Sequence, residues 1–203
     1  MGLALAPKAA QAAIVIDFSS GLASPGGSFT LNGTNAIGVN IPIGGVTWDI
    51  NGTTGSACVY SALGSANGLC GQFSGVLNFD TAANTISITG SIPQLGINSP
   101  VTLLTGTFIS WVADTNGLHT AIGLDTKSSA LLLALGVPTN TVFSYFGFST
   151  TTIQGCIPTQ TAPCTLISTD IRNTAVPEPG TLMLLGGGLL GLAAVARRRI
   201  RKA

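Results

Sequence analysis

The chain has 203 residues, of which 45% are hydrophobic and only 7% are charged. So large an apolar fraction argues against an intrinsically disordered chain. A single stretch that approaches about 20 uninterrupted apolar residues argues against a membrane protein with several spans. The formal net charge of +1 comes from a basic C-terminal cluster. The rest of the chain is mildly acidic and lacks the basic face that a nucleic-acid partner requires.

The first thirteen residues have the character of the end of a secretory signal peptide. Ala10-Gln11-Ala12 forms an A-x-A cleavage signal, with cleavage expected before Ala13. The apolar run ahead of it is short and has no basic start, so we expect the signal peptide to begin upstream of Met1. The alternative is an ordinary flexible N-terminus. We therefore interpret 1–13 as the end of a signal peptide and 14–172 as an exported domain.

From Ile14 onward the pattern predicts one β-strand after another. Segments that alternate with period two, or that concentrate β-branched and aromatic residues, lie at 14–18, 46–50, 73–80, 85–92, 107–113, 118–124, 142–148 and 166–171. Asn51-Gly52 is a tight-turn pair that ends the second segment. Short polar turns at 81–84 and 114–117 predict two further β-hairpins.

One helical segment interrupts the strands. Strong helix formers follow the capping serines Ser128 and Ser129, and the segment ends at Gly136, with Pro138 beyond it. Many short strands with one short helix predict an all-β fold, an antiparallel β-sandwich or jelly-roll-like domain. Its candidate core residues are the aromatic side chains of Trp48, Phe73, Phe79 and Trp111.

The four cysteines form two local pairs. Cys58 and Cys70 are twelve residues apart, and Cys156 and Cys164 are eight apart. Nearest-neighbour pairing is the simplest of the three possible connectivities. A zinc site would require closer spacing and histidine partners, so disulfide bonds are the favoured interpretation and no metal site is expected. Disulfide bonds indicate an oxidising compartment, in agreement with export.

The sequence offers no evident catalytic constellation. His119, the single histidine, is expected on the solvent side of its strand, opposite Leu118, Ile122 and Leu124. The one glutamate, Glu178, lies in the C-terminal tail, so paired carboxylates for glycoside hydrolysis would have to be aspartates. The candidates are spread along the chain at Asp49, Asp80, Asp114, Asp125 and Asp170. We therefore expect neither enzymatic activity nor a cofactor.

The C-terminal tail, 173–203, has three zones in a fixed order. The first is a rigid, extended, proline-flanked motif formed by Val176, Pro177, Glu178, Pro179 and Gly180. The second is the uncharged segment 181–196. With Pro179 and Gly180 it would reach about 27 Å as a helix, against a bilayer core of about 30 Å, and we expect a single transmembrane helix. The third is a basic end that stops translocation by the positive-inside rule, formed by Arg197, Arg198, Arg199, Arg201 and Lys202.

This order of zones resembles the PEP-CTERM sorting signal of Gram-negative bacteria, whose central motif corresponds to Pro177-Glu178-Pro179. The resemblance covers 176–202. It implies processing by an exosortase, a membrane cysteine transpeptidase, after a transient stay in the inner membrane. It also implies a destination at the cell surface or in the extracellular matrix, often in bacteria that produce exopolysaccharide and biofilm. The alternative interpretation of the tail is a permanent C-terminal membrane anchor.

Three hypotheses remain for the exported domain. The first is a non-enzymatic structural or adhesive role, with exopolysaccharide or the protein itself as partner. The second is a secreted hydrolase of matrix polysaccharide that uses aspartates. The third is a glycan-binding or ice-binding module, since the same type of tail occurs on some proteins named for ice binding. A concave pocket that gathers two aspartates would favour the hydrolase, and a flat, regular array of threonines would favour ice binding.

Overall fold

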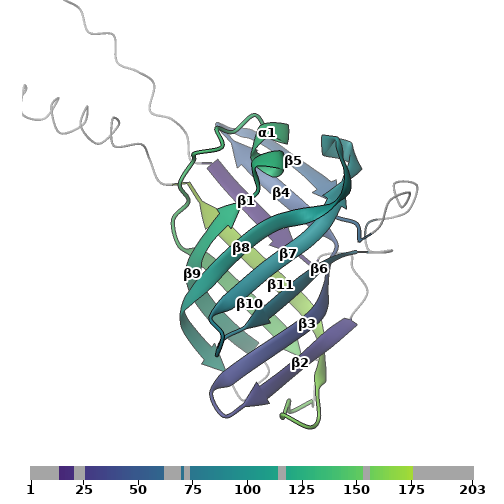
Figure 1. Ribbon diagram of the computed structural model, residues 1–203, viewed down its shortest axis with the longest axis vertical. Helices are drawn as coiled ribbons and strands as arrows, with labels where there is room; N and C mark the ends of the chain where they lie inside the picture. Colours follow the sequence, from purple (N-terminus) through teal and green to yellow (C-terminus); the bar gives the residue numbers. More distant parts are fainter. Residues whose placement is uncertain are drawn as a thin grey trace, which may run out of the picture.

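The computed structural model describes residues 14–20, 26–61, 70, 74–113, 118–152 and 156–175. These residues form β-strands almost throughout, with one short α-helix and one 3-10 helix (Figure 1). The strands are β1 (Ile14–Ser19), β2 (Gly26–Asn32), β3 (Asn35–Ile43), β4 (Gly45–Ile50), β5 (Thr53–Cys58), β6 (Gly75–Asp80), β7 (Thr85–Ile92), β8 (Ile97–Ala113), β9 (Leu118–Lys127), β10 (Phe146–Thr152) and β11 (Cys164–Thr174). The helices are η2 (Pro93–Leu95) and α1 (Ser129–Ala134).

Eight of the described strands close into an antiparallel barrel. Their order around the barrel is β10-β9-β8-β7-β6-β3-β2-β11, and β11 then pairs with β10 to close the ring. Most neighbours in this ring are also neighbours in sequence, and short turns connect β6 to β7 and β2 to β3. The remaining strands, β1, β4 and β5, extend the sheet sideways from β11.

The predicted all-β class with one short helix is confirmed, but the predicted β-sandwich is wrong, because the strands close into a barrel. The physical reason lies in β11. Near its start, Cys164 and Leu166 pair with β2, and its last residues, Asp170–Thr174, pair with β1. The opposite edge of β11 pairs with β10. The strand β11 therefore closes the ring by pairing with both β10 and β2, and it also pairs with β1, the first strand of the β1-β4-β5 extension. Two separate sheets do not form.

Aromatic rings fill the interior of the barrel. Phe79 contacts four other aromatic rings, with ring centroids between 5.2 and 6.1 Å apart. Those partners include Phe29, Phe108, Phe148 and Trp111. Of the predicted core residues, Phe79 is buried, and Trp48 and Trp111 are partly buried against the core. Phe73 lies outside the described residues.

The expected orientation of β9 is wrong. His119 is fully buried, 4.7 Å from Phe29 between ring centroids and stacked on Trp111, whereas Leu118, Ile122 and Leu124 are between 45% and 48% exposed. The aromatic rings of neighbouring strands explain the inversion. A side chain at Gly123 would overlap the ring of Phe146. The middle of the inward face of β9 therefore carries the small residues Ala121 and Gly123, and the larger aliphatic residues of this strand face outward.

The helix α1 forms as the sequence predicts and lies at one end of the barrel (Figure 1). The side chain of Ser128 accepts a hydrogen bond from the backbone N–H of Leu131 at 3.2 Å, which caps the helix N-terminus. Gly136 follows with a φ of 69°, in the left-handed region that commonly ends a helix. Leu131 and Leu132 are buried against the barrel.

The turns between strands also follow from local sequence. Asn51 and Gly52 have φ values of 56° and 82°, so both central residues of this hairpin turn lie in the left-handed region, as a type I′ turn requires. The hairpins β6–β7 and β8–β9 pair as predicted. The second predicted turn, 114–117, lies outside the described residues, as do 1–13 and 176–203. No helix among the described residues is long and apolar enough to span a membrane, and the predicted span at 181–196 falls outside them.

Candidate functional site

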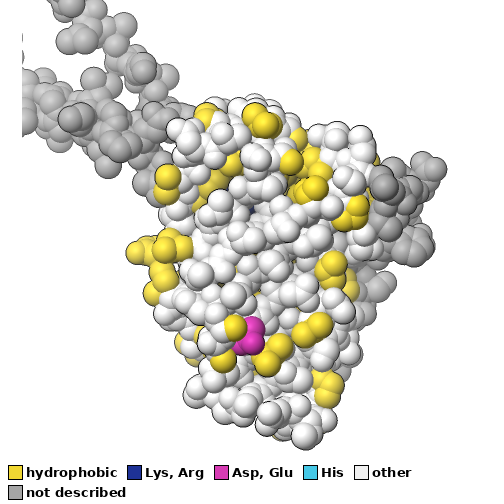
Figure 2. Space-filling model, viewed as in Figure 1, with side chains coloured by type: hydrophobic (Ala, Val, Ile, Leu, Met, Phe, Trp, Pro, Cys, Tyr) yellow, Lys and Arg dark blue, Asp and Glu magenta, His cyan; other side chains and the backbone are white. Residues whose placement is uncertain are grey.

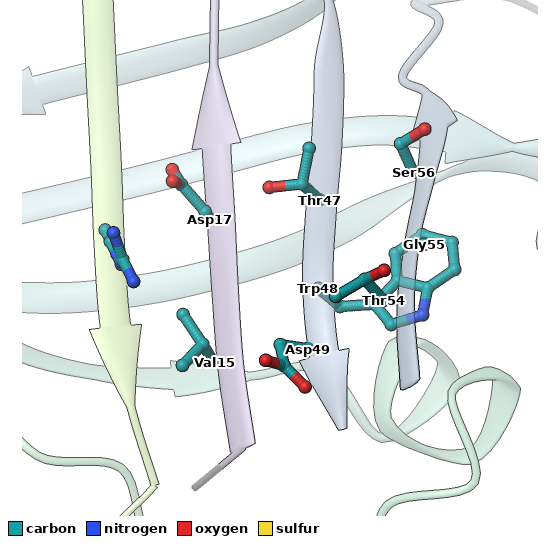
Figure 3. Close-up of a pocket in the computed structure, with 9 residues that line it drawn as sticks. Val15, Asp17, Thr47, Trp48, Asp49, Thr54, Gly55 and Ser56 are labelled. Carbon is teal, nitrogen blue, oxygen red and sulfur yellow. The ribbon is translucent and has the colours of Figure 1, made fainter. Parts of the chain in front are cut away.

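The side extension of the barrel carries an open groove of about 480 Å³ on one face of β11, β1, β4 and β5 (Figure 3). Its geometry follows from strand register. Arg172, Asp17, Thr47 and Ser56 are paired in one row across the four strands. The next row contains Thr174, Val15, Asp49 and Thr54. Side chains two residues apart on a strand share a face, so both rows project their polar groups to the same side.

Three carboxyl groups lie diagonally across this face. Asp170 on β11 is paired with Ser19, two residues along β1 from Asp17. Asp49 on β4 is paired with Val15, two residues from Asp17 in the other direction. Diagonal neighbours of this kind are about 7–8 Å apart. The fold therefore brings Asp17 and Asp49 into one groove, with Asp170 directly beside Asp17.

The carboxyl group of Asp17 in this groove has a raised pKa. Burial raises its pKa from 3.8 to about 7, and the hydrogen bond and negative charge of Asp170 add to this increase, while the nearby charge of Arg172 opposes it. One carboxyl oxygen of Asp17, Oδ1, is buried and accepts no hydrogen bond from the described residues. Asp17 can therefore hold or release a proton near neutral pH.

Asp49 and Trp48 also have structural roles. The Oδ1 atom of Asp49 accepts a hydrogen bond of 2.9 Å from the backbone N–H of Gly52, which supports the β4–β5 turn. The indole of Trp48 lies against Gly55, whose missing side chain leaves room for the ring (Figure 3). Both residues line the groove while holding β4 and β5 together.

The other candidate carboxylates lie elsewhere. The Oδ1 atom of Asp80 accepts hydrogen bonds from the backbone N–H groups of Ala82 and Ala83 and therefore forms the β6–β7 turn. Asp125 lies in a buried polar cluster inside the barrel. Asp114 is outside the described residues. Sequence reasoning misses Asp17 because a lone aspartate in an alternating strand resembles any outward-facing polar residue, and only the register places it beside Asp170.

Two disulfide bonds fasten loops near the strands. Cys58 pairs with Cys70 and Cys156 pairs with Cys164, with Cα–Cα distances of 5.1 Å and 5.9 Å. This is the nearest-neighbour pairing that the spacing predicts. No group of histidine, cysteine or acidic residues within the described ranges has the arrangement of a metal site.

On β8 and β9, the exposed threonines do not form the flat array expected of an ice-binding face. On β8 and β9, Thr105 is paired with Thr126, but the neighbouring cross-strand pairs combine Thr107 with Leu124 and Val112 with Thr120. Aliphatic side chains therefore interrupt the threonine rows on a sheet that curves into a barrel. Figure 2 shows one face of the domain, where uncharged surface predominates and hydrophobic side chains are scattered among polar ones.

The predicted processing motif and membrane stop lie outside the described residues. The structure does describe the chain up to the residue before the motif. Thr174 is the last residue of β11, and the backbone N–H of Ala175 donates a hydrogen bond of 2.7 Å to the carbonyl of Ile14. Residues 173 and 174 of the predicted tail therefore belong to the last strand, and the chain leaves the folded domain at Ala175.

Comparison with known proteins identifies this tail. A family model, the PEP-CTERM protein-sorting motif, matches residues 175–199. No curated protein matches the chain, and no solved structure matches it. The motif implies export to the cell surface in a Gram-negative bacterium and processing by an exosortase, which is a membrane protein. The chain therefore carries a PEP-CTERM protein-sorting motif, which follows directly after its β-barrel domain.

Proposed function

We propose that the barrel domain is a non-enzymatic, adhesive surface protein that binds glycan, such as exopolysaccharide, through the groove on β11, β1, β4 and β5. In this proposal the tail is held in the inner membrane, is cut near Pro177-Glu178-Pro179, and the domain then reaches the extracellular matrix.

The adhesive role is supported by the concentration of hydrogen-bonding groups on one open face of the domain. The groove combines the carboxyl groups of Asp17 and Asp49 with the guanidinium of Arg172 and with hydroxyl groups that include that of Thr47. A sugar ring presents closely spaced hydroxyl groups that both donate and accept hydrogen bonds, and these side chains supply both kinds of partner. The low charge of the chain, 7%, favours a neutral or weakly charged polymer over a highly charged one.

The test is binding of the purified protein to immobilised bacterial cellulose, dextran and alginate. Replacing Thr47 by valine and Arg172 by glutamine removes donors from the groove. Each lost hydrogen bond is worth about 0.5–1.5 kcal/mol, so affinity should fall roughly 2- to 10-fold per substitution. Thr126→Val makes the same change at an exposed threonine on β9 and should leave binding unchanged. Equal binding by the groove variants and the control would refute the assignment of the groove.

The second candidate function is hydrolysis of a matrix polysaccharide, and one observation favours it. The pKa of Asp17 is raised to about 7, and Asp49 lies diagonally opposite in the same groove, so one open site contains a carboxyl group that can hold a proton and a second carboxyl group, as glycoside hydrolysis requires. The hydrogen-bonded pair of Asp17 and Asp170 is too close to hold a glycosidic bond between its members. Hydrolysis would therefore use Asp17 as the acid and Asp49 as the base.

The release of reducing ends from the same three polysaccharides distinguishes the two functions. The adhesive proposal predicts no release above a boiled control. Release by the wild-type protein that disappears in Asp17→Asn, while binding persists, would replace the adhesive function with the hydrolytic one.

A further inference from the structure

A compact polar cluster lies inside the barrel, away from the groove. The Nζ atom of Lys127 is 2.7 Å from Oδ1 of Asn173 and 2.5 Å from Oδ2 of Asp125. The Nδ2 atom of Asn173 donates a hydrogen bond of 2.6 Å to Oδ1 of Asp125. One carboxyl group therefore contacts both the amine of the lysine and the amide nitrogen of the asparagine.

The cluster is shielded from water. The side chains of Lys127 and Asp125 have no exposed surface, and Asn173 is 3% exposed. Nζ of Lys127 lies 4.7 Å from the centre of the Phe143 ring. Asn173 is paired with the fully buried Ile16 on β1. A lysine with this degree of burial is rare, and an ion pair buried this deeply gives little net stability over apolar packing.

We propose that Lys127 and Asn173 form an intramolecular amide bond, an isopeptide cross-link between β9 and β11, with Asp125 as the catalytic residue that transfers the proton. The neutral amine of Lys127 attacks Cγ of Asn173, which forms the Nζ–Cγ bond. Asp125, in its protonated form, donates a proton to the amide oxygen and then accepts one from Nζ. Collapse of the tetrahedral intermediate breaks the Cγ–Nδ2 bond as Asp125 delivers that proton to Nδ2. The proton on the former amide oxygen returns to Asp125 as the C=O bond reforms, so Asp125 ends protonated, as it began. The products are one secondary amide and one ammonia molecule, and no oxidant or other reactant is needed.

The geometry and the protonation states both suit this reaction. The Cγ–Oδ1 bond of Asn173 is about 1.2 Å long, so Cγ lies within about 4 Å of Nζ, close to an attack distance. Burial lowers the pKa of Lys127 and raises the pKa of Asp125, although their mutual attraction opposes both shifts. Desolvation therefore favours the neutral amine and the protonated carboxyl group that the first step requires.

The position of the cross-link suggests what it does. Asn173 is two residues before Ala175, where the matched sorting motif begins. A covalent bond at this point would tie the last strand of the barrel to β9 and would prevent force on the C-terminal end from peeling β11 away. This inference does not depend on glycan binding or on hydrolysis.

Mass spectrometry of the full chain, reduced and denatured, tests the proposal. A cross-linked protein is lighter than its sequence by one ammonia molecule. Trypsin should fail to cut after the acylated Lys127, and the peptide that begins at Asn173 should remain attached to the peptide that contains Lys127. A chain with the unmodified mass, cut after Lys127, would overturn the proposal whatever the variants show.

Two variants assign the roles. Asp125→Asn keeps the shape of the side chain but cannot transfer the proton, so the cross-linked peptide should be lost, and circular dichroism establishes whether the barrel still forms. Lys127→Arg retains the positive charge without a comparable nucleophile and should also abolish the link. In contrast, Asp80→Asn, in the β6–β7 turn, should cross-link fully. Complete cross-linking in Asp125→Asn would refute the role of that carboxyl group.

Discussion

Replacing Asp17 by asparagine should change how the stability of the domain depends on pH. Burial and the neighbouring Asp170 raise the pKa of Asp17 from 3.8 to about 7 in the folded state. The folded state therefore binds the proton more tightly than the unfolded state does. The wild-type protein should lose stability as the pH rises from about 4 to about 7, and the loss should then level off. Asparagine resembles the protonated carboxyl group and should avoid this loss.

The size of the effect follows from the shift. About three pKa units correspond to roughly 4 kcal/mol at 1.36 kcal/mol per unit. Asp17 is partly exposed in the open groove, so solvent screening reduces the expected effect to about 1–2 kcal/mol. For a domain of this size, that is a difference of several degrees in Tm. At pH 8, Asp17→Asn should melt several degrees above the wild type, and at pH 4 the difference should be smallest.

Thermal unfolding followed by circular dichroism at pH 4, 6 and 8 measures this difference. Ser56→Ala, at the far end of the same row, removes no titratable group, so its offset from the wild type should be independent of pH. An offset for Asp17→Asn that is equally independent of pH would refute the electrostatic account of the groove.

Two further predictions concern the barrel and its disulfide bonds. Gly123→Ala places a methyl group against the Phe146 ring and the carbonyl of Thr107, so it should destabilise the domain by about 1–3 kcal/mol in urea unfolding. On the adjacent strand, the carbon added by Gly147→Ala would lie 3.9 Å from its nearest neighbour, the carbonyl oxygen of Arg172, so this variant should change stability by less than about 1 kcal/mol. Equal effects of the two substitutions would contradict a filled interior. Replacing Cys156 and Cys164 by serine should cost about 2–3 kcal/mol, with peptide mapping of the unreduced wild type as the check. Free thiols in the exported protein would contradict the pairing.

The hairpins can be predicted because their signals, alternating residues and short polar turns, lie close together in the sequence. Alternating residues flank the turn after β6, and the turn pair Asn51-Gly52 ends β4. The helix α1 begins at a capping serine and ends before Gly136. The strands β2, β3 and β5 are not predicted, because glycine and asparagine weaken their pattern. Gly38 and Gly55 fit into strands because aromatic rings, those of Phe79 and Trp48, occupy the space of a side chain. Each ring belongs to the neighbouring strand, so the sequence around the glycine does not reveal that its place in the strand is filled.

Closure of the barrel and assembly of the groove depend on contacts between distant parts of the chain. The three diagonal carboxyl groups come from β1, β4 and β11, and Asp17 is separated from Asp170 by most of the sequence. The buried position of His119 likewise depends on rings contributed by β2 and β8. Periodicity identifies the two faces of a strand, but it does not decide which face is inside when both carry apolar residues.

Mass spectrometry of the mature protein from a Gram-negative host with its exosortase tests most directly the claim that the tail is a processed sorting signal. We predict a C-terminus at or near Pro177-Glu178-Pro179, with 181–203 absent. Replacement of these three residues by alanine should leave the tail in place and the full-length protein in the inner membrane. A mature wild-type protein that still ends at Ala203 would contradict the account and would make the tail a permanent anchor.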